Sequence, residues 1–194
     1  PPPPAPHRGH AAALSALGRA EGIRGGPALA CQPALFVNTQ PIELYQMDFL
    51  DMSVRDIREL VPDSPIVLEI NETAVTKSEQ MKQLRAILTD LNLELAYDDF
   101  GVGQKRLVEL AKLPPDYLKF DMSIMRNIHI APKRLHQIIL TFMKAAEELG
   151  IKTLAEGVEC HEEGAVCEEL GFEYAQGYFY GKPAPISELI PADN

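Results

Sequence analysis

Short apolar runs alternate with amphipathic stretches along most of this chain, and this alternation limits the folds it can adopt. Each run has the length of a strand and the stretches between several of them have helical periodicity. Strands that alternate with helices indicate a parallel sheet or a (β/α) barrel, and six strands are two fewer than the eight of a closed barrel. The predicted strands are ALFVN (34–38), IVLEI (66–70), ELAYDD (94–99), YLKFD (117–121), KTLAEGV (152–158) and YAQGYFY (174–180).

Three helices are predicted between these strands. Thr76 and Glu79 have the spacing of a capping box at the start of a helix over 76–92. A second helix is predicted from about Lys133 to Leu149, before Gly150, and a third over 161–170, before Gly171. The predicted apolar faces comprise Met81, Leu84, Leu88 and Leu91 in the first helix and Ile138, Ile139, Phe142, Met143, Ala146 and Leu149 in the second.

The first 33 residues have a different composition. Five of the first six are proline, and glycine and alanine dominate the rest. We expect a linker with at most one weak helix, because Gly18 and Gly22 disfavour a long one. The predicted domain organisation is therefore a linker over 1–33 and one α/β domain over 34–194.

The composition excludes several classes of function. The chain has 18 basic and 28 acidic residues, a net charge of −10, which disfavours binding to polymeric nucleic acid or to an anionic membrane. No apolar run reaches the length of a membrane span, and the N-terminal residues lack the order of a secretion signal. We therefore expect no membrane insertion and an intracellular, cytoplasmic protein.

The cysteines and histidines are not expected to form a site. Cys31, Cys160 and Cys167 are odd in number and lack C-x-x-C spacing, so packing or surface roles are predicted rather than disulfides or a thiolate zinc site. None of the histidines lies at the end of a predicted strand, so ordinary surface roles are expected of them too.

Polar side chains recur near the ends of the predicted strands. Parallel strands meet at their carboxyl ends, where this fold class builds its active sites. Buried polar groups are costly unless they are paired or bind cations, so the cluster predicts a divalent metal site. Oxygen donors favour magnesium, manganese or calcium. The residues concerned are Asn38, Glu69, Asp98, Lys119 and Glu156.

Asp98 and Asp99 are adjacent, and consecutive residues of a strand point in different directions, so they could reach two ions. Two ions about 4 Å apart can activate a water and stabilise an in-line attack on phosphorus, while Lys119 neutralises charge or orients the water. For any single position, an N-cap or a solvated loop role is the alternative. Gly101 and Gly103 predict a loop over a ligand or a plain β-to-α turn.

The motifs, taken together, resemble the EAL-domain family of bacterial cyclic di-GMP phosphodiesterases. The resemblance covers about residues 34–190. It rests on the segments FVN (36–38), EINE (69–72), DDFGVG (98–103), LKFD (118–121), AEGVE (155–159) and QGYFYGKP (176–183), in this order.

The resemblance implies a modified TIM-type (β/α) barrel that hydrolyses cyclic di-GMP to linear pGpG with Mg²⁺ or Mn²⁺, two ions in an intact site. It also implies a possible homodimer through helices near the DDFGVG loop. The site residues it implies are the metal ligands Asn38, Glu69, Asp98 and Asp99, the catalytic Lys119 and Glu156, the loop-bracing Glu72, and the substrate-binding Asp121, Glu159, Gln176, Gly177 and Pro183.

The sequence also departs from that family. No Glu-Ala-Leu segment precedes FVN, so the family's first two strands and one metal-binding glutamate are not found here. Three hypotheses follow. The first is a cyclic di-GMP phosphodiesterase, the second a catalytically impaired EAL-like receptor or interaction module, and the third a metal-dependent barrel enzyme for another phosphodiester. Aromatic residues 178–180 either stack on a base or belong to the core.

Overall fold

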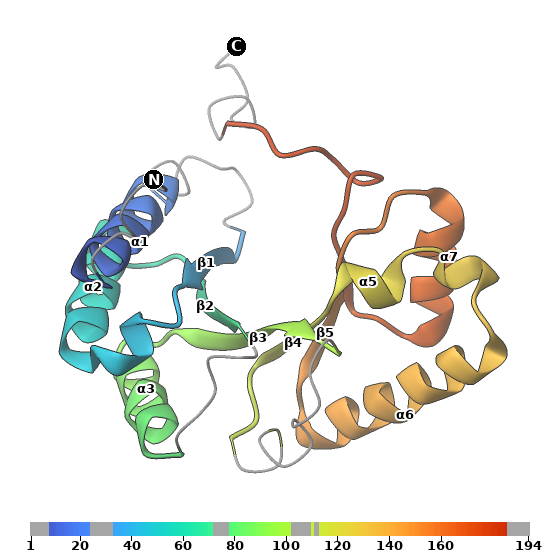
Figure 1. Cartoon of the computed structure of the whole chain (residues 1–194), viewed down its shortest axis with the longest axis horizontal. Coiled ribbons are helices and arrows are strands. Elements are labelled where there is room, and N and C mark those ends of the chain that lie inside the picture. The colour runs from blue at the N-terminus through green and yellow to red at the C-terminus, as the bar shows by residue number, and fades with distance from the viewer. Residues whose placement is uncertain (1–7, 24–32, 72–77, 102–109, 111–112, 186–194) are drawn as a thin grey trace, which may run out of the picture. The chain divides into compact units, whose positions relative to one another are not determined.

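The computed structural model describes residues 8–23, 33–71, 78–101, 110 and 113–185. Strands alternate with helices, as predicted, in two compact units, the first extending to Leu95 and the second from Ala96 to Pro183 (Figure 1). Unit 1 contains α1 (Arg8–Ile23), β1 (Leu35–Thr39), η2 (Glu43–Tyr45), α2 (Met47–Leu60), β2 (Ile66–Asn71) and α3 (Ser78–Asp90). Most of β3 (Glu94–Phe100) belongs to unit 2, with β4 (Tyr117–Phe120), α5 (Met122–Met125), η4 (Ile128–Ile130), α6 (Lys133–Leu149), β5 (Lys152–Ala155), α7 (His161–Leu170) and β6 (Tyr174–Ala175).

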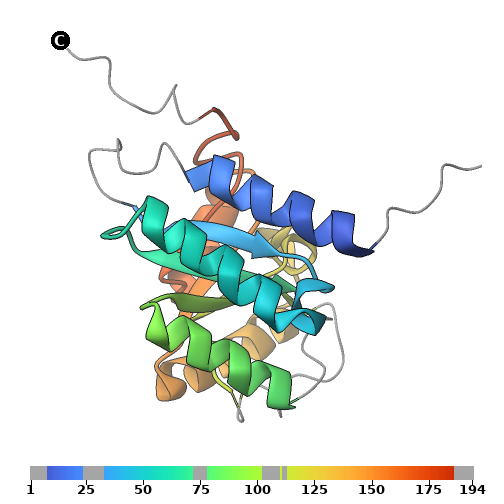
Figure 2. The same cartoon turned by 90° about the vertical axis from the view of Figure 1, so that its left-hand side faces the viewer.

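Unit 1 is built on the parallel pair β1 and β2. Residues 66–70 of β2 are all buried, which is typical of a parallel strand covered on both faces. Helices α1, α2 and α3 lie side by side along these strands (Figure 2). The predicted stripe of α3 contributes Met81, Leu84 and Leu88 to the core. Thr76 of the predicted capping box lies outside the described residues.

Helix α1 is longer than the sequence suggests. It continues through Gly18 and Gly22 as far as Ile23, although both glycines disfavour a helix. Burial of Arg19 and Ile23 and the contact of α1 with β1 and α2 stabilise it. Tertiary packing therefore outweighs local propensity here.

Unit 2 has the parallel strand order β3, β4, β5, β6. Aromatic rings fill its core: Phe100 lies edge-on to Phe120 and Phe142, each at 5.2 Å between centroids. Helix α6 packs against β5, and α7 packs against α6 (Figure 1). Both end at a left-handed glycine, Gly150 and Gly171, as predicted.

Three sequence expectations fail in unit 2. Strand β5 ends at Ala155 rather than at Val158. Strand β6 ends at Ala175, and the aromatic residues 178–180 form an exposed turn rather than a strand or core. Ile138 and Leu149 of α6 are 54% and 47% exposed, because the helix buries a narrower face than the one its apolar residues span.

No helix among the described residues has both the length and the apolar character needed to cross a membrane.

Candidate functional site

Asn38 and Glu69 lie side by side near the ends of β1 and β2 in unit 1. They are register partners in the parallel pair β1 and β2, as the strand-end argument predicts. Glu69 is buried, at 5% exposure, whereas Asn38 is exposed. Both remain predicted metal ligands.

A buried ion pair fixes the backbone at Asn38. Arg19 of α1 contacts Glu43 of η2 at 2.5 Å between Nη2 and Oε1, and their side chains are 2% and 0% exposed. Arg19 Nη1 donates a hydrogen bond to the Asn38 carbonyl at 2.9 Å, and Nη2 donates one to Ser53 Oγ at 2.8 Å. The Gln40 backbone N–H donates to Glu43 at 2.7 Å. Sequence reasoning missed this network, because Arg19 lies in the segment predicted as a linker.

Unit 2 collects acidic side chains at the end of β3 and just after β5. The pairing of β3 with β4 shifts register between Tyr97 and Phe100, and Asp99 has a left-handed backbone with φ of 59°. This irregularity brings carboxylate oxygens of Asp98, Asp99 and Glu156 within 4.8 Å of one another. The two aspartates therefore belong to one cluster with Glu156. In a regular strand, consecutive side chains would point to opposite faces.

Lys119 of β4 lies between two of these acids. Its buried Nζ is 2.8 Å from Asp98 Oδ1 and 2.9 Å from Glu156 Oε1. Gln176 Nε2 donates to Glu156 Oε1 at 2.7 Å. The structure thus brings together five predicted site residues, from β3, from β4 and from the chain after β5 and β6.

The charge of the cluster affects Asp99 most clearly. Burial, the neighbouring Asp98 and then Asp121 raise the pKa of Asp99 above its ordinary value, while Lys119 opposes the shift. A raised carboxyl pKa means that the ionised form is disfavoured by its surroundings. A cation bound beside Asp99 would relieve that penalty.

Asp99→Asn is therefore expected to stabilise the metal-free protein at neutral pH. The ionised Asp99 opposes folding, so its cost is absent below the pKa of the unfolded chain and complete above the raised pKa of the folded chain. Asparagine also tolerates the left-handed backbone. Thermal unfolding in chelator should show an advantage that shrinks as the pH becomes acidic, and Mn²⁺ should stabilise the natural protein more than the variant. Equal melting temperatures at every pH would contradict this.

Gly177 lets the chain after β6 turn closely around Val158. A Cβ at Gly177 would lie 2.1 Å from the Val158 carbonyl oxygen and 2.3 Å from its nitrogen. The turn is closed by hydrogen bonds from Val158 N–H to the Gln176 carbonyl at 3.0 Å and from Phe179 N–H to the Val158 carbonyl at 3.1 Å. Gly177 therefore helps to hold Gln176 beside Glu156.

Gly177→Ala is expected to destabilise the protein by about 1–3 kcal/mol, because the methyl group would overlap backbone atoms that cannot move independently. Gly181→Ala is the matched control, since a Cβ at Gly181 meets nothing within 4 Å. Urea unfolding of both variants measures the difference. The steric argument is wrong if the two alanine variants unfold at the same urea concentration.

The remaining predicted residues have other contacts or lie outside the described residues. Asp121 is the N-cap residue of α5 and accepts a hydrogen bond from the Ser123 backbone N–H at 2.8 Å, and its side chain also hydrogen-bonds Asp99. Glu159 pairs with Arg126. Pro183 is exposed. The structure does not describe Glu72. The substrate-binding roles of Asp121, Glu159 and Pro183 and the loop-bracing role of Glu72 stay predictions.

The donor chemistry of the cluster fits a hard divalent cation. The donors of Asp98, Asp99 and Glu156 are carboxylate oxygens, which suit magnesium, manganese or calcium. Three carboxylates and one lysine carry a net charge of about −2 when all are ionised. Charge and donor type both match divalent metal binding.

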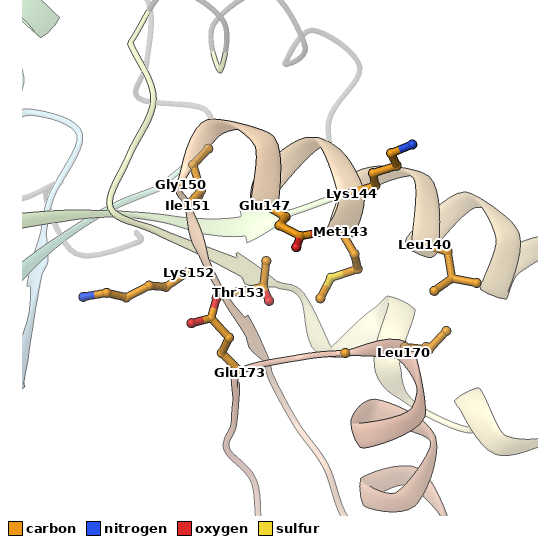
Figure 3. A pocket seen from close by; sticks show the side chains of 11 residues that line it. Leu140, Met143, Lys144, Glu147, Gly150, Ile151, Lys152, Thr153, Leu170 and Glu173 are labelled. Atoms are coloured by element: carbon orange, nitrogen blue, oxygen red, sulfur yellow. The ribbon is translucent and has the colours of Figure 1, made fainter.

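A cavity lies at the other end of β5. Its volume is about 750 Å³, and it is bordered by α6, the start of β5 and the end of α7. Met143, Glu147 and Thr153 point toward one another there (Figure 3). This cavity contains none of the predicted site residues, because Lys152 and Thr153 begin the strand that Glu156 follows.

Comparison with known proteins gives consistent matches. The sequence model of the EAL domain matches residues 15–183. The probable cyclic di-GMP phosphodiesterase PdeN of Escherichia coli is 31% identical over 79% of this chain and 30% of its own length. The cyclic di-GMP phosphodiesterase RocR of Pseudomonas aeruginosa is 32% identical over 67% of this chain and 33% of its own. The chain thus spans about a third of the length of these two relatives.

Solved structures extend the match to the fold. The EAL domain of DcpA from Mycobacterium smegmatis has a TM-score of 0.79 and 28% identity, covering 90% of this chain and 79% of that one. BlrP1 of Klebsiella pneumoniae, as a manganese and cyclic di-GMP complex, has a TM-score of 0.73 and 30% identity, over 86% and 43% of the two chains. These likenesses confirm the predicted α/β fold of the TIM-type barrel class.

Proposed function

Since this chain belongs to the EAL domain family, we propose that it is a divalent-metal-dependent phosphodiesterase domain that hydrolyses cyclic di-GMP to linear pGpG. Two relatives are a cyclic di-GMP phosphodiesterase and a probable one, and a similar structure holds manganese and cyclic di-GMP. The observation that carries the proposal is Lys119 between Asp98 and Glu156, with Asp99 in the same cluster.

The proposed ligands of the cation are Asp98 and Asp99, with Asn38 and Glu69 as further predicted ligands, and Glu156 belongs to the same carboxylate cluster. Mg²⁺ or Mn²⁺, two ions in the intact site, would supply Lewis acidity and an activated water when bound. Calcium also fits the donor set, and a similar structure of BlrP1 is a calcium complex.

The chain's own groups have separate proposed roles. Glu156 would accept the proton of the attacking water as general base, held in place by Gln176. Lys119 would stabilise the negative charge that develops on the phosphate, because its ion pairs hold a positively charged ammonium group within the carboxylate cluster. Asp121, Glu159, Gln176, Gly177 and Pro183 are the proposed substrate-binding positions, and Glu72 the proposed brace of the loop after Asp98 and Asp99.

Incubation of the purified chain with cyclic di-GMP and Mn²⁺, followed by chromatography of the nucleotides, tests this function. We expect pGpG to accumulate and to disappear when a chelator is added. An aryl phosphodiester in parallel reactions separates a cyclic di-GMP enzyme from one for another phosphodiester. No product from demonstrably folded chain would contradict the enzyme assignment.

The second candidate is a catalytically impaired EAL-like domain that acts as a cyclic di-GMP receptor or interaction module. The ion pairs of Lys119 with Asp98 and Glu156 favour it, because they already balance two carboxylates of the cluster without a bound cation. Calorimetric titration of folded chain with cyclic di-GMP distinguishes the two: binding without turnover supports the receptor, and metal-dependent product excludes it.

A cytoplasmic location and a homodimer complete the proposal. A bacterial second messenger is a cytoplasmic substrate, and the resemblance suggests dimerisation through helices near the DDFGVG loop. We expect light scattering of the purified chain to give the mass of two chains. A monomer at high concentration would contradict this prediction.

A further inference from the structure

A second group of side chains with donor atoms that could hold a metal ion lies in unit 2, formed by His129, Cys160 and Glu163. His129 belongs to η4, Cys160 directly precedes α7, and Glu163 lies in the first turn of that helix. One imidazole nitrogen, the thiol sulfur and one carboxylate oxygen lie within 4.8 Å of one another. Three different donor types from two separate segments thus converge.

The imidazole contributes an atom whose hydrogen-bonding capacity is unused. Nδ1 of His129 is buried and has no hydrogen-bond partner. Such a buried polar atom is costly, and in a neutral imidazole one ring nitrogen offers a lone pair that suits a metal ion. His129 therefore gives an observation that hydrogen bonding within the protein does not explain.

The carboxylate is held rigidly in place. Glu163 is only 3% exposed, and its two oxygens accept hydrogen bonds from the backbone N–H groups of Asn127 and Glu159, each at 2.7 Å. Burial opposes ionisation, but the hydrogen bonds from Glu159, Asn127 and Cys160 outweigh it and lower the pKa of Glu163. An anionic, fixed oxygen therefore faces the imidazole and the thiol.

The thiol is not used to cap the helix. Cys160 is the N-cap residue of α7, yet its side chain makes no capping hydrogen bond. It does hydrogen-bond the exposed Glu162 side chain. A hydrogen bond from the Glu162 backbone and then the one from Cys160 lower the pKa of that carboxyl group. The sulfur remains near His129 and Glu163 and would lose its proton on binding a metal.

We propose that His129, Cys160 and Glu163 bind one zinc-class divalent cation. Nitrogen, sulfur and oxygen are the ligands that Zn²⁺ takes, whereas a thiolate disfavours magnesium. A tetrahedral zinc site separates its ligand atoms by roughly 3 to 4 Å, so a small side-chain adjustment suffices. Water or Glu162 completes the coordination, and the thiol proton goes to solvent.

The bound ion would link two segments that are distant in sequence. It joins η4, which follows β4, to the turn between β5 and α7. That turn begins at Glu156, four residues before Cys160. The proposed role is therefore structural support of the segment that carries Glu156, and it does not depend on whether the chain hydrolyses cyclic di-GMP.

Cobalt(II) reports directly on this site, because a thiolate ligand gives it a strong charge-transfer absorption in the near ultraviolet. The intact chain is first saturated with Mg²⁺ to occupy the carboxylate cluster and is then titrated with Co²⁺. We expect this absorption to saturate at one cobalt per chain and to be displaced by zinc. Cys160→Ser should abolish it, and His129→Gln should weaken cobalt binding at least about tenfold.

Cys167→Ser is the matched control. Cys167 lies in α7, the helix that Cys160 precedes, but it is buried, and burial raises the pKa of its thiol to about 11, so it should not contribute. Cys31→Ser is a second control. The proposal is overturned if folded natural protein gives no thiolate absorption, if Cys160→Ser retains it, or if either control variant loses it. Circular dichroism establishes folding in each case.

Zinc-dependent melting provides an independent measurement. One equivalent of zinc should raise the melting temperature of the natural protein and of Cys167→Ser, but not that of Cys160→Ser or His129→Gln. If His129 and Glu163 form only an ion pair, zinc will shift all four proteins equally or none of them. Either of these results overturns the zinc site.

Discussion

Asp98→Asn is expected to lower metal-dependent hydrolysis of cyclic di-GMP by a factor on the order of 100 or more. The substitution removes one of three clustered carboxylates and so weakens the binding of the cation that would stabilise the transition state. Asparagine keeps the size of the side chain. Lys119 retains its 2.9 Å contact with Glu156, so the local structure should persist.

The measurement is initial-rate pGpG formation across a range of Mn²⁺ concentrations, with circular dichroism to establish folding. Asp90→Asn is the control, because Asp90 is exposed, belongs to unit 1 and pairs with Arg55. If lost metal affinity is the cause, higher Mn²⁺ should restore part of the rate. Turnover of Asp98→Asn at the natural rate, at every Mn²⁺ concentration, would exclude this residue from the metal site.

Glu156→Gln gives a complementary result. Loss of a general base typically costs about 10²–10⁴ in rate, and added metal should not restore it, because an amide cannot accept the proton. The two variants therefore separate metal binding from proton transfer. Equal rescue of both by Mn²⁺ would instead assign Glu156 to metal binding alone.

Much of the fold could be predicted from periodicity. Strands β1 to β4 begin and end within one residue of the apolar runs, because a buried parallel strand is necessarily a short apolar segment. Strand β6 is shorter than predicted, since Gly177 allows a turn that alternating aromatic residues conceal. The length of helix α1 was underestimated, because the helix is stabilised by the ion pair of Arg19 with Glu43, which is distant in sequence.

The candidate site was only partly predictable. Its polar residues could be found because polar strand ends are unusual in a covered parallel sheet. The close approach of Asp98 and Asp99 depends on a register shift, which the alternation of a regular strand does not reveal. The group around His129 was missed because its residues lie in a turn and at a helix start. The i, i+3 spacing of Cys160 and Glu163 is the signal that could have found it.

Glu43→Leu is expected to destabilise the protein by about 3–5 kcal/mol, because it leaves the buried Arg19 guanidinium without its counter-charge. The effect should be this large because Arg19 is also prevented from reaching water: it is 4% exposed, and its Nη atoms are directed at Asn38 and Ser53. Urea unfolding followed by circular dichroism measures the loss. Arg55→Ala, at an exposed ion pair, is the control and should change the unfolding free energy far less.

The double variant Arg19→Met with Glu43→Leu distinguishes a buried charge from a general packing defect. Removing both charges eliminates the uncompensated cation, so the double variant should be more stable than Glu43→Leu alone. If the double variant is less stable instead, the network stabilises unit 1 through shape rather than charge. Because Arg19 also holds the Asn38 carbonyl, both variants should weaken Mn²⁺ binding if Asn38 is a ligand, even where the fold survives.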